Sequence, residues 1–396
     1  MAFGIGWTPI PNIDINLNLS GLVIKMKITK VEAIPFRIPY GKLLSWATGS
    51  ADAAEHVLVR IHTDEGIVGL AESIPRPTIY GESQVSVCHA VLNWFAPILE
   101  GASPFDINRI HREMSQYFAN HTAKAAIDMA LYDIQAKAAG LPLCRFLGGE
   151  YSESGIPVTW MVHLDDLGSM VRQVQEKFEQ GYRSFKLKGG TDAAKDVLLV
   201  RTIRRELGEE PLLYIDANQG YSPPEAAYVA KQCLEFGVTI LEEPIRKELY
   251  AARKDFKQRQ LNGCGEIQVL GDDSVYTPFD VMRELQERTI DLISLKTART
   301  GVTDSRKIAA IAEQFGAGLL IGTQGDSAIG TMLSAQIAMG LGVLKYPAEL
   351  SFFTILPGDL LEHPPVVRDG RLVIPCLPGS GVELNDRAFA RYRQDR

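Results

Sequence analysis

The chain of 396 residues has few cysteines, and no two of them form a CxxC pair. An odd number of widely spaced cysteines excludes a disulfide scaffold and a zinc ribbon. Thiols spread in this way are typical of a reducing environment, so we expect a cytoplasmic protein. The five cysteines are Cys88, Cys144, Cys233, Cys264 and Cys376.

Long apolar runs and an excess of positive charge are missing as well. No uninterrupted apolar run approaches the roughly 18 residues of a membrane span, so we expect no membrane partner. Lys and Arg total 41 against 48 Asp and Glu, a formal net charge of −7. Because an acidic surface repels phosphate backbones, we expect no nucleic-acid partner either.

The first 25 residues lack the basic start and the apolar segment of a secretion signal. Met26 opens a strand-like segment, so we expect residues 1–25 to be an extension outside the fold. The length of the chain predicts two domains, one of them large.

The pattern of the first domain changes from strands to helices. β-type alternation dominates residues 26–73, with a turn at 64–66. Over residues 84–147 apolar side chains recur every three or four positions, which predicts helices. We therefore expect an α+β domain over residues 26–150, joined by a C-terminal tail, 358–396, that packs back on it.

Short apolar runs alternate with helical stretches over residues 151–357. Seven of these runs end in a charged or polar residue, and consecutive end residues lie 24 to 30 positions apart. A strand, a loop and a helix fill about this length, so the repeat predicts an α/β fold, a (β/α)8 barrel of the TIM type. The alternative is an open doubly wound sheet. The end residues are Lys188, Asp216, Glu242, Asp272, Lys296, Thr323 and Glu349.

Three of these end residues, Asp216, Glu242 and Asp272, are carboxylates from successive units. The carboxyl ends of barrel strands share one mouth, so these side chains are expected to converge. Converging carboxylates repel one another unless a cation lies between them, and oxygen ligands suit Mg²⁺, with Mn²⁺ as an alternative. The adjacent Glu243 and Asp273 are expected to point to the opposite strand face.

Lysines flank the acidic residues. Lys186 and Lys188 share one strand face, and Lys296 ends a strand across the barrel. Asn218, two positions after Asp216, is expected to share its face and to contact a ligand. We expect mutual repulsion and a nearby cation to lower the lysine pKa values, so that one lysine is neutral near pH 7 and acts as a base.

The combination of acids and lysines suggests a particular chemistry. A proton next to a carboxylate is very weakly acidic, and its removal gives a dianionic enediolate that a divalent cation neutralises. We therefore expect a metal-dependent enzyme that acts on a small-molecule carboxylate. A metal-stabilised barrel that only binds ligands is the less favoured interpretation.

The ordered segments KLK, DAN, LEEP, GDDS and SLKTARTG resemble the muconate-lactonising subgroup of the enolase superfamily, as does AKAAIDMALYDIQAKAAGLPLCRFLGG before the barrel. The resemblance implies a barrel with a capping domain formed by the N-terminal region and the tail. It also implies homo-oligomers. It assigns metal binding to Asp216, Glu242 and Asp272, acid/base roles to Lys188 and Lys296, and a polarising role to Lys186.

The same resemblance bears on the substrate. Asp326 and Glu349 match glutamates of the seventh and eighth strands, so we expect both near the substrate. No histidine occurs between His163 and His363, which excludes the histidine base of mandelate racemase-like members. The eighth strand also lacks the DxD by which dipeptide epimerases of this subgroup hold an α-ammonium group.

Substrate choice is expected to lie with two loops of the first domain, 43–56 and 73–83. Arg76 is expected to pair with a second substrate carboxylate, while Trp46 and Tyr80 close off water. The favoured reaction is cycloisomerisation of a muconate-like diacid. Racemisation or epimerisation of an amino-acid derivative comes second, and dehydration of a hydroxy acid third.

Overall fold

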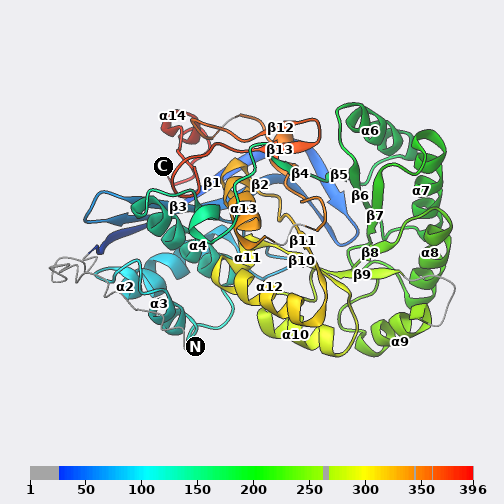
Figure 1. Cartoon of the computed structure of the whole chain (residues 1–396), viewed down its shortest axis with the longest axis horizontal. Coiled ribbons are helices and arrows are strands. Elements are labelled where there is room, and N and C mark those ends of the chain that lie inside the picture. The colour runs from blue at the N-terminus through cyan, green and yellow to red at the C-terminus, as the bar shows by residue number, and fades with distance from the viewer. Residues whose placement is uncertain (1–25, 262–266, 343–344, 359, 396) are drawn as a thin grey trace, which may run out of the picture.

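The computed structural model describes most of the chain, in these stretches: 26–261, 267–342, 345–358 and 360–395. The extension expected over residues 1–25 lies outside the described residues, as does Cys264. The other four cysteines are free. Figure 1 shows an N-terminal group of strands and helices beside a curved row of parallel strands with helices around it.

Three antiparallel strands form the sheet of the capping domain: β1 (Ile28–Trp46), β2 (Gly49–Thr63) and β3 (Val68–Ser73), in that order. The turn expected at residues 64–66 is confirmed, because it joins β2 to β3.

The loop predicted over residues 43–56 is wrong, because these residues form the tip of the β1–β2 hairpin. Pairing shifts register between Pro39 and Leu44 and then resumes, with Leu44 opposite Ala51. Small and polar residues at the tip break the apolar alternation, so the sequence does not reveal this pairing.

Helices follow the sheet: α1 (Gln84–His89), the π-helical η2 (Ala90–Phe95), α2 (Ala96–Leu99), α3 (Ile107–Met114), α4 (His121–Ala138) and α5 (Leu143–Phe146). The long helix α4 packs closely on β3. A Cβ built at Gly69 of β3 would lie 2.1 Å from the carbonyl oxygen of Ala130 in α4, so only glycine permits this approach.

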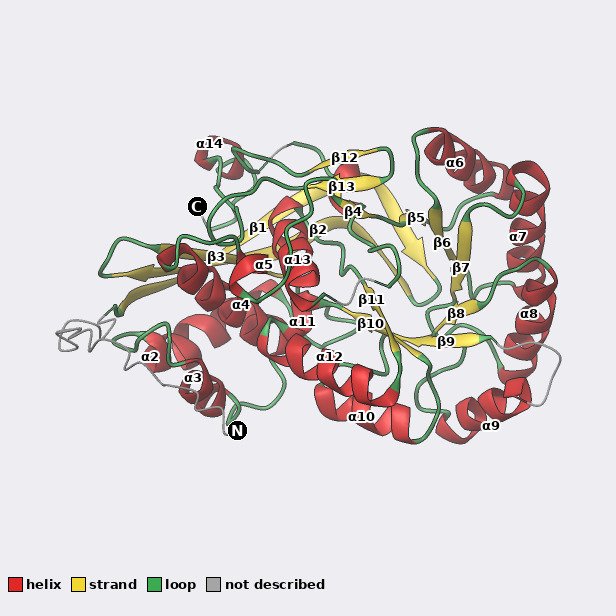
Figure 2. Cartoon of the chain, in the orientation of Figure 1, coloured by secondary structure: helices red, strands yellow, loops and turns green. Residues whose placement is uncertain are grey.

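Seven parallel strands form the barrel in sequence order: β5 (Trp160–Val162), β6 (Ser184–Lys188), β7 (Leu212–Asp216), β8 (Ile240–Glu242), β9 (Gln268–Gly271), β10 (Leu292–Leu295) and β11 (Gly318–Ile321). Helices lie outside them (Figure 2): α6 (Leu167–Glu179), α7 (Ala193–Leu207), α8 (Pro223–Glu235), α9 (Tyr250–Leu261), α10 (Pro278–Gln286), α12 (Thr303–Phe315) and α13 (Ala328–Leu341).

The eighth strand predicted around residues 344–350 is replaced by a short extended piece. The Ala348 N–H donates to the Pro157 carbonyl next to β5, at 2.9 Å. The Glu349 N–H donates to the Ile321 carbonyl of β11, at 2.8 Å. This piece therefore joins the first strand to the last, which closes the ring and favours the barrel over the open sheet.

The floor of the barrel is a packed layer of apolar side chains. Each is at most 2% exposed, and each comes from a different strand. Because this layer fills the interior below the strand ends, the barrel opens only at the mouth. The layer consists of Tyr214, Ile240, Leu270, Leu292 and Leu320.

The C-terminal tail contains β12 (Val366–Arg368), β13 (Arg371–Val373) and α14 (Asp386–Phe389), and follows η3 (Phe352–Ile355). β13 pairs with β4 (Ile156–Pro157), and the Arg37 N–H of β1 donates to the Tyr392 carbonyl at 2.9 Å. The tail therefore touches both parts of the molecule.

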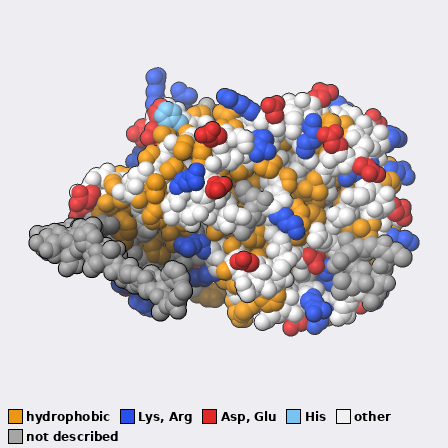
Figure 3. Space-filling model, in the orientation of Figure 1, with side chains coloured by type: hydrophobic (Ala, Val, Ile, Leu, Met, Phe, Trp, Pro, Cys, Tyr) orange, Lys and Arg blue, Asp and Glu red, His pale blue; other side chains and the backbone are white. Residues whose placement is uncertain are grey.

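On the face in Figure 3, Lys and Arg side chains are interspersed with Asp and Glu among the described atoms. Within the described stretches, no helix has the length and apolar character needed to cross a membrane.

Candidate active site

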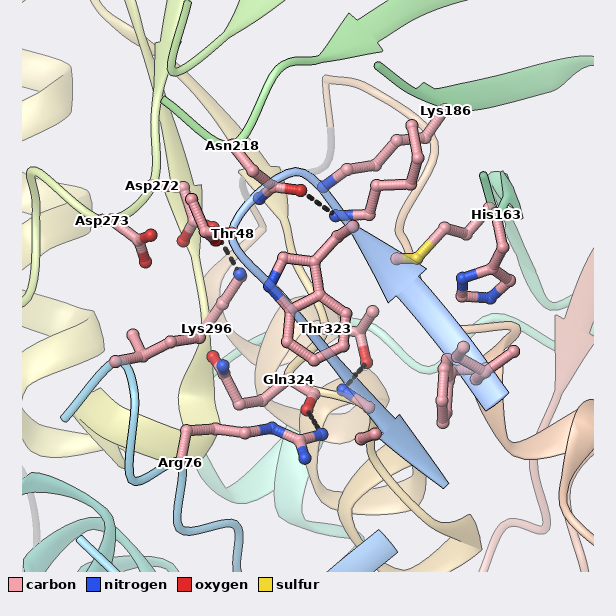
Figure 4. Close-up of a pocket in the computed structure, with 18 of the residues that line it drawn as sticks. Thr48, Arg76, His163, Lys186, Asn218, Asp272, Asp273, Lys296, Thr323 and Gln324 are labelled. Atoms are coloured by element: carbon pink, nitrogen blue, oxygen red, sulfur yellow. Dashed lines mark hydrogen bonds and ion pairs between the residues drawn. The ribbon is translucent and has the colours of Figure 1, made fainter. Parts of the chain in front are cut away.

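A cavity lies at the carboxyl ends of the barrel strands, bordered by the β1–β2 hairpin (Figure 4), and contains about 710 Å³ of space not filled by atoms. Its polar wall comes from the barrel: Lys186, Lys188, Asn218, Asp272, Asp273, Lys296, Thr323 and Gln324. Its apolar wall combines side chains of the β1–β2 hairpin, Tyr40, Leu44, Trp46 and Ala51, with Ile79, Met161 of β5 and Phe352 of η3.

Lys186 of β6 is the centre of a buried charge cluster. Its Nζ atom lies 3.0 Å from Asp216 Oδ2, 2.8 Å from Glu242 Oε2 and 3.0 Å from Glu349 Oε1. The Tyr214 hydroxyl donates to Glu349 Oε1 at 2.7 Å. Burial opposes the charged form of Lys186, but the carboxylates outweigh it and raise its pKa well above the usual value.

Lys188 lies on the same strand face and contacts the end of β7. Its Nζ donates to Asp216 Oδ2 at 2.6 Å and to Asn218 Oδ1 at 2.9 Å. Asn218 has a left-handed backbone, with φ +43°, and its N–H donates to Asp216 Oδ1 at 3.0 Å. Asn218 therefore faces Asp216 through a turn after β7. Burial opposes ionisation of Asp216, but Lys186 and Lys188 hold its pKa at about 2.

Lys296 and Asp272 form the opposite part of the cluster. Lys296 Nζ donates to Asp272 Oδ2 at 2.5 Å. Arg299 donates to Asp272 Oδ1 through one terminal nitrogen and to the Asp272 carbonyl through the other, both at 3.0 Å. Burial opposes the charge on Lys296, but Asp272 raises its pKa above the usual value.

Sequence analysis missed Arg299. It lies in a short helix, α11 (Thr297–Thr300), three positions after Lys296. That spacing brings the two side chains to one face of a helical turn, which is the signal that would have found it.

The lowered lysine pKa values were predicted for lysines beside a cation. Among the chain's own groups the direction is the opposite for Lys186 and Lys296, because each ammonium faces a carboxylate oxygen within 3.0 Å. Attraction at this distance exceeds the repulsion between the lysines.

The two pairs of adjacent acids behave differently. Glu242 faces the cluster, while Glu243 accepts the N–H of Asp272 at 2.7 Å and so braces the turn after β9. Asp273, in contrast, lines the cavity together with Asp272. The prediction that only one aspartate enters is wrong, because β9 ends before both of them and strand alternation no longer applies.

Gln324 joins the barrel to the capping domain, and sequence analysis missed it as well. Arg76 donates to the Gln324 carbonyl at 2.5 Å, and the Tyr80 hydroxyl donates to Gln324 Oε1 at 2.5 Å. Arg76 lines the cavity, whereas Tyr80 lies behind Gln324 and within 3.4 Å of Arg299.

Like Tyr80, two more predicted substrate-binding residues lie outside the cavity lining. Asp326 is 2% exposed and accepts hydrogen bonds from the Gln324 N–H, at 2.8 Å, and from the Thr323 hydroxyl. Burial raises its pKa. Glu349 lies beneath Lys186, 2% exposed. Asp326 and Glu349 therefore position residues that line the cavity, but they do not line it themselves.

Asp216, Glu242 and Asp272, the residues expected to bind a metal, carry the oxygen ligands that a divalent cation prefers. In this structure their carboxylates contact lysine ammonium groups instead. Among the described residues, no three Asp, Glu, His or Cys side chains are arranged to hold an ion. Glu242 Oε2 is buried and accepts no hydrogen bond, although Lys186 Nζ lies 2.8 Å away. An oxygen donor without a hydrogen bond, beside further carboxylates, suits a hard cation once the ammonium groups move aside.

Two family models match the chain. Residues 28–148 match the mandelate racemase / muconate lactonizing enzyme N-terminal domain, and residues 169–388 match the enolase C-terminal domain-like model. The second match alone covers more than half of the chain.

Known proteins of similar length divide between two activities. An L-Ala-D/L-Glu epimerase of Bacillus subtilis (strain 168) is 31% identical over 363 residues, which cover 90% of this chain and 97% of that protein. The structure of a muconate lactonizing enzyme from Mucobacterium Smegmatis, complexed with muconolactone, is 35% identical with a TM-score of 0.89, and covers 93% of this chain and 100% of that one.

A third similar structure holds a metal. The dipeptide epimerase from Cytophaga hutchinsonii, complexed with Mg and the dipeptide D-Ala-L-Val, is 28% identical with a TM-score of 0.85, and covers 92% of this chain and 98% of that one. The family models match both domains, and the similar structures share the fold over nearly the whole chain. The chain belongs to the mandelate racemase/muconate lactonizing enzyme family of the enolase superfamily, and is an enzyme that acts at the carbon next to a carboxylate.

Proposed function

We propose that this enzyme is a metal-dependent cycloisomerase of a muconate-like dicarboxylate. The observation that carries the proposal is the charge of the cavity. Its barrel wall presents the ammonium groups of Lys186, Lys188 and Lys296, and the capping domain adds the guanidinium of Arg76. Asp272 and Asp273 are the acids of the lining, and Asp216, Glu242 and Glu349 lie beneath it beside Lys186 and Lys188. With a divalent ion held by Asp216, Glu242 and Asp272, positive charge would exceed negative charge around the cavity and would favour a substrate with more than one negative charge.

Lys188 and Lys296 are the proposed proton-transfer residues. They come from β6 and from the residue after β10, four strands apart, and both line the cavity. This separation lets one lysine reach each side of a substrate carbon. Lys186, held among three carboxylates, stays charged and is suited to polarise the substrate carboxylate.

Asp216, Glu242 and Asp272 are the residues that would hold Mg²⁺, or Mn²⁺ in its place. When bound, the ion supplies positive charge that stabilises the electron-rich carboxylate formed on loss of the α-proton. Support comes from the Mg bound in the similar dipeptide epimerase structure and from Glu242 Oε2, which accepts no hydrogen bond. Arg299 orients Asp272, because it holds both the carboxylate and the backbone carbonyl of that residue.

Arg76 is the proposed partner of the second substrate carboxylate. One of its terminal nitrogens donates to the Gln324 carbonyl, and no acidic side chain of the described residues pairs with it. Its remaining N–H groups are therefore free to bind an anion in the cavity. The 35% identity with the muconolactone-bound enzyme agrees with a dicarboxylate or its lactone.

Racemisation or epimerisation of an amino-acid derivative is the second candidate. The lysines on separate walls favour it, because a two-base reaction needs one on each side of the α-carbon. The 31% identity with the L-Ala-D/L-Glu epimerase is in agreement. Glu349-Leu-Ser occupies the eighth-strand segment in place of a DxD, so a free α-ammonium group finds fewer acidic partners there.

The test is NMR in D₂O with Mg²⁺ and a panel of muconolactone, N-acyl amino acids and dipeptides. Deuterium entering muconolactone next to its carboxylate, with one configuration retained, is expected for the cycloisomerase. Loss of configuration in an amino-acid derivative would replace it by the second candidate. Chelation with EDTA should stop the exchange, and exchange that continues in EDTA would contradict the metal assignment.

Two lysine variants test the residue assignment in the same assay. Lys188→Ala and Lys296→Ala should each abolish exchange of the proton on one side of the carbon. Lys307→Ala is the matched control, because Lys307 is exposed and pairs only with Asp304 on the surface. Full exchange in both active-site variants would contradict the assignment.

A further inference from the structure

His163 lies at the mouth of the barrel, immediately after β5. Its side chain lines the cavity, and Figure 4 shows it on the side away from Lys296 and Asp272. Its ring lies edge-on to Phe352, with centroids 6.1 Å apart and an interplanar angle of 74°. The His163 ring therefore packs against Phe352 and also borders the cavity.

The imidazole has no hydrogen-bond partner among the described residues, although it is only partly exposed. A neutral imidazole carries one N–H donor and one nitrogen acceptor, and leaving both unpaired in a cavity is costly. A bound molecule in the cavity can satisfy them. Its neighbours Met161 and Phe352 have no group that would compete for such a molecule through strong hydrogen bonds.

The charges around His163 determine which kind of ligand atom suits it. Burial, followed by the positive charges of Lys188, Lys42 and Lys186, lowers the pKa of His163 to about 4. The ring is therefore neutral at pH 7 and is a poor base. The same lysines make the local potential positive, which attracts electron-rich oxygen atoms.

We propose that His163 is a substrate-binding residue whose ring N–H donates a hydrogen bond to a carboxylate or carbonyl oxygen at the end of the substrate away from Lys296. The inference rests on the proposed function and deepens it, because it adds a polar contact from the barrel wall to the one proposed for Arg76. Arg76 supplies charge from the capping domain, while His163 supplies a directional hydrogen bond from the barrel. The cavity then selects substrates that carry an oxygen acceptor at that end.

Calorimetric binding of three probes that share a six-carbon acyl chain to the Mg²⁺-saturated enzyme tests the proposal. Adipate has a carboxylate at the far end, its monomethyl ester has an uncharged carbonyl there, and hexanoate has neither. His163→Phe keeps the ring shape without the donor, and His163→Gln keeps a donor. We expect His163→Phe to weaken adipate and the ester about tenfold, with hexanoate unchanged, and His163→Gln to recover much of the loss.

Arg76→Met distinguishes the two contacts, because it should weaken adipate more than the uncharged ester. Equal binding of adipate by wild type and His163→Phe, an equal loss for hexanoate, or no wild-type preference for adipate over hexanoate would overturn the inference. Deuterium exchange into muconolactone is measured on the same samples. If the wild type fails to exchange while the probe pattern holds, the proposed function fails and the role of His163 stands.

Discussion

Replacing Lys186 by methionine removes a cation that touches three buried carboxylates. Lys186 is 1% exposed, and Asp216, Glu242 and Glu349 all lie within 3.0 Å of its Nζ. Removing one partner of a buried ion pair costs about 3–5 kcal/mol, because the remaining charges stay buried without compensation. We therefore expect Lys186→Met to be strongly destabilised at pH 8 in the absence of added metal.

The size of the change in melting temperature follows from the length of the chain. Unfolding entropy of about 2.1 cal/mol/K per residue gives about 0.8 kcal/mol/K for 396 residues. A loss of 3–5 kcal/mol then lowers the melting temperature by about 4–6 °C. The control Lys307→Met breaks an exposed pair with Asp304 and should shift it by about 1 °C or less.

The dependence on pH distinguishes lost charge from lost packing. Without Lys186 these carboxyl groups have raised pKa values in the folded state, so the destabilisation that they cause is smallest at low pH and grows as pH rises. The deficit should therefore shrink between pH 8 and pH 5. The double variant Lys186→Met/Glu349→Gln should melt higher than Lys186→Met alone, because it removes one of the three uncompensated charges. A deficit that is the same at both pH values, or no recovery in the double variant, would refute the reasoning.

Three further changes have defined outcomes. Arg299→Lys loses the pair of hydrogen bonds to Asp272 and should raise the Mg²⁺ concentration for half-maximal deuterium exchange about 10–100-fold. An unchanged Mg²⁺ titration would contradict this. Gly322→Ala places a Cβ 2.4 Å from Ser294 Oγ and 3.0 Å from Lys296 Cε, and should lower kcat while far-ultraviolet circular dichroism stays the same; normal kcat would show that both side chains adapt. The pKa of His163, about 4 against 6.5 when unfolded, adds stability that is present above pH 6.5 and is lost as pH falls toward 4. Between pH 7.5 and pH 5 this loss is about 2 kcal/mol in the wild type, and His163→Gln should lack it in urea unfolding; an equal loss in both proteins would contradict the shift.

The sequence predicts the barrel well because its signal is local and repeated. Lys188, Asp216 and Glu242 end their strands as the spacing indicates, and Asp272 and Lys296 follow theirs by one residue. Each position depends on a short apolar run and on the helix that follows it. Such patterns can be recognised in the sequence without knowledge of contacts between distant segments.

The remaining parts of the site depend on contacts between distant segments. Tyr80 and Gln324 are 244 positions apart, and nothing near either residue indicates the hydrogen bond between them. The orientation of Asp326 away from the cavity follows from the turn that contains Thr323, and a family position cannot reveal it. His163 carries no motif, and its place in the cavity depends on how the hairpin of the capping domain crosses the mouth.

A segment more than 350 positions later in the chain completes the edge of the capping sheet. Gln394 donates its N–H to the Pro35 carbonyl, and Phe389 packs edge-on against Phe36 with centroids 5.3 Å apart. At about 5–20 residues per second, a ribosome needs roughly 20–70 s to travel between these segments. During that interval Phe36 lacks its final cover, so a capping sheet that forms before the later segment emerges exposes an apolar edge.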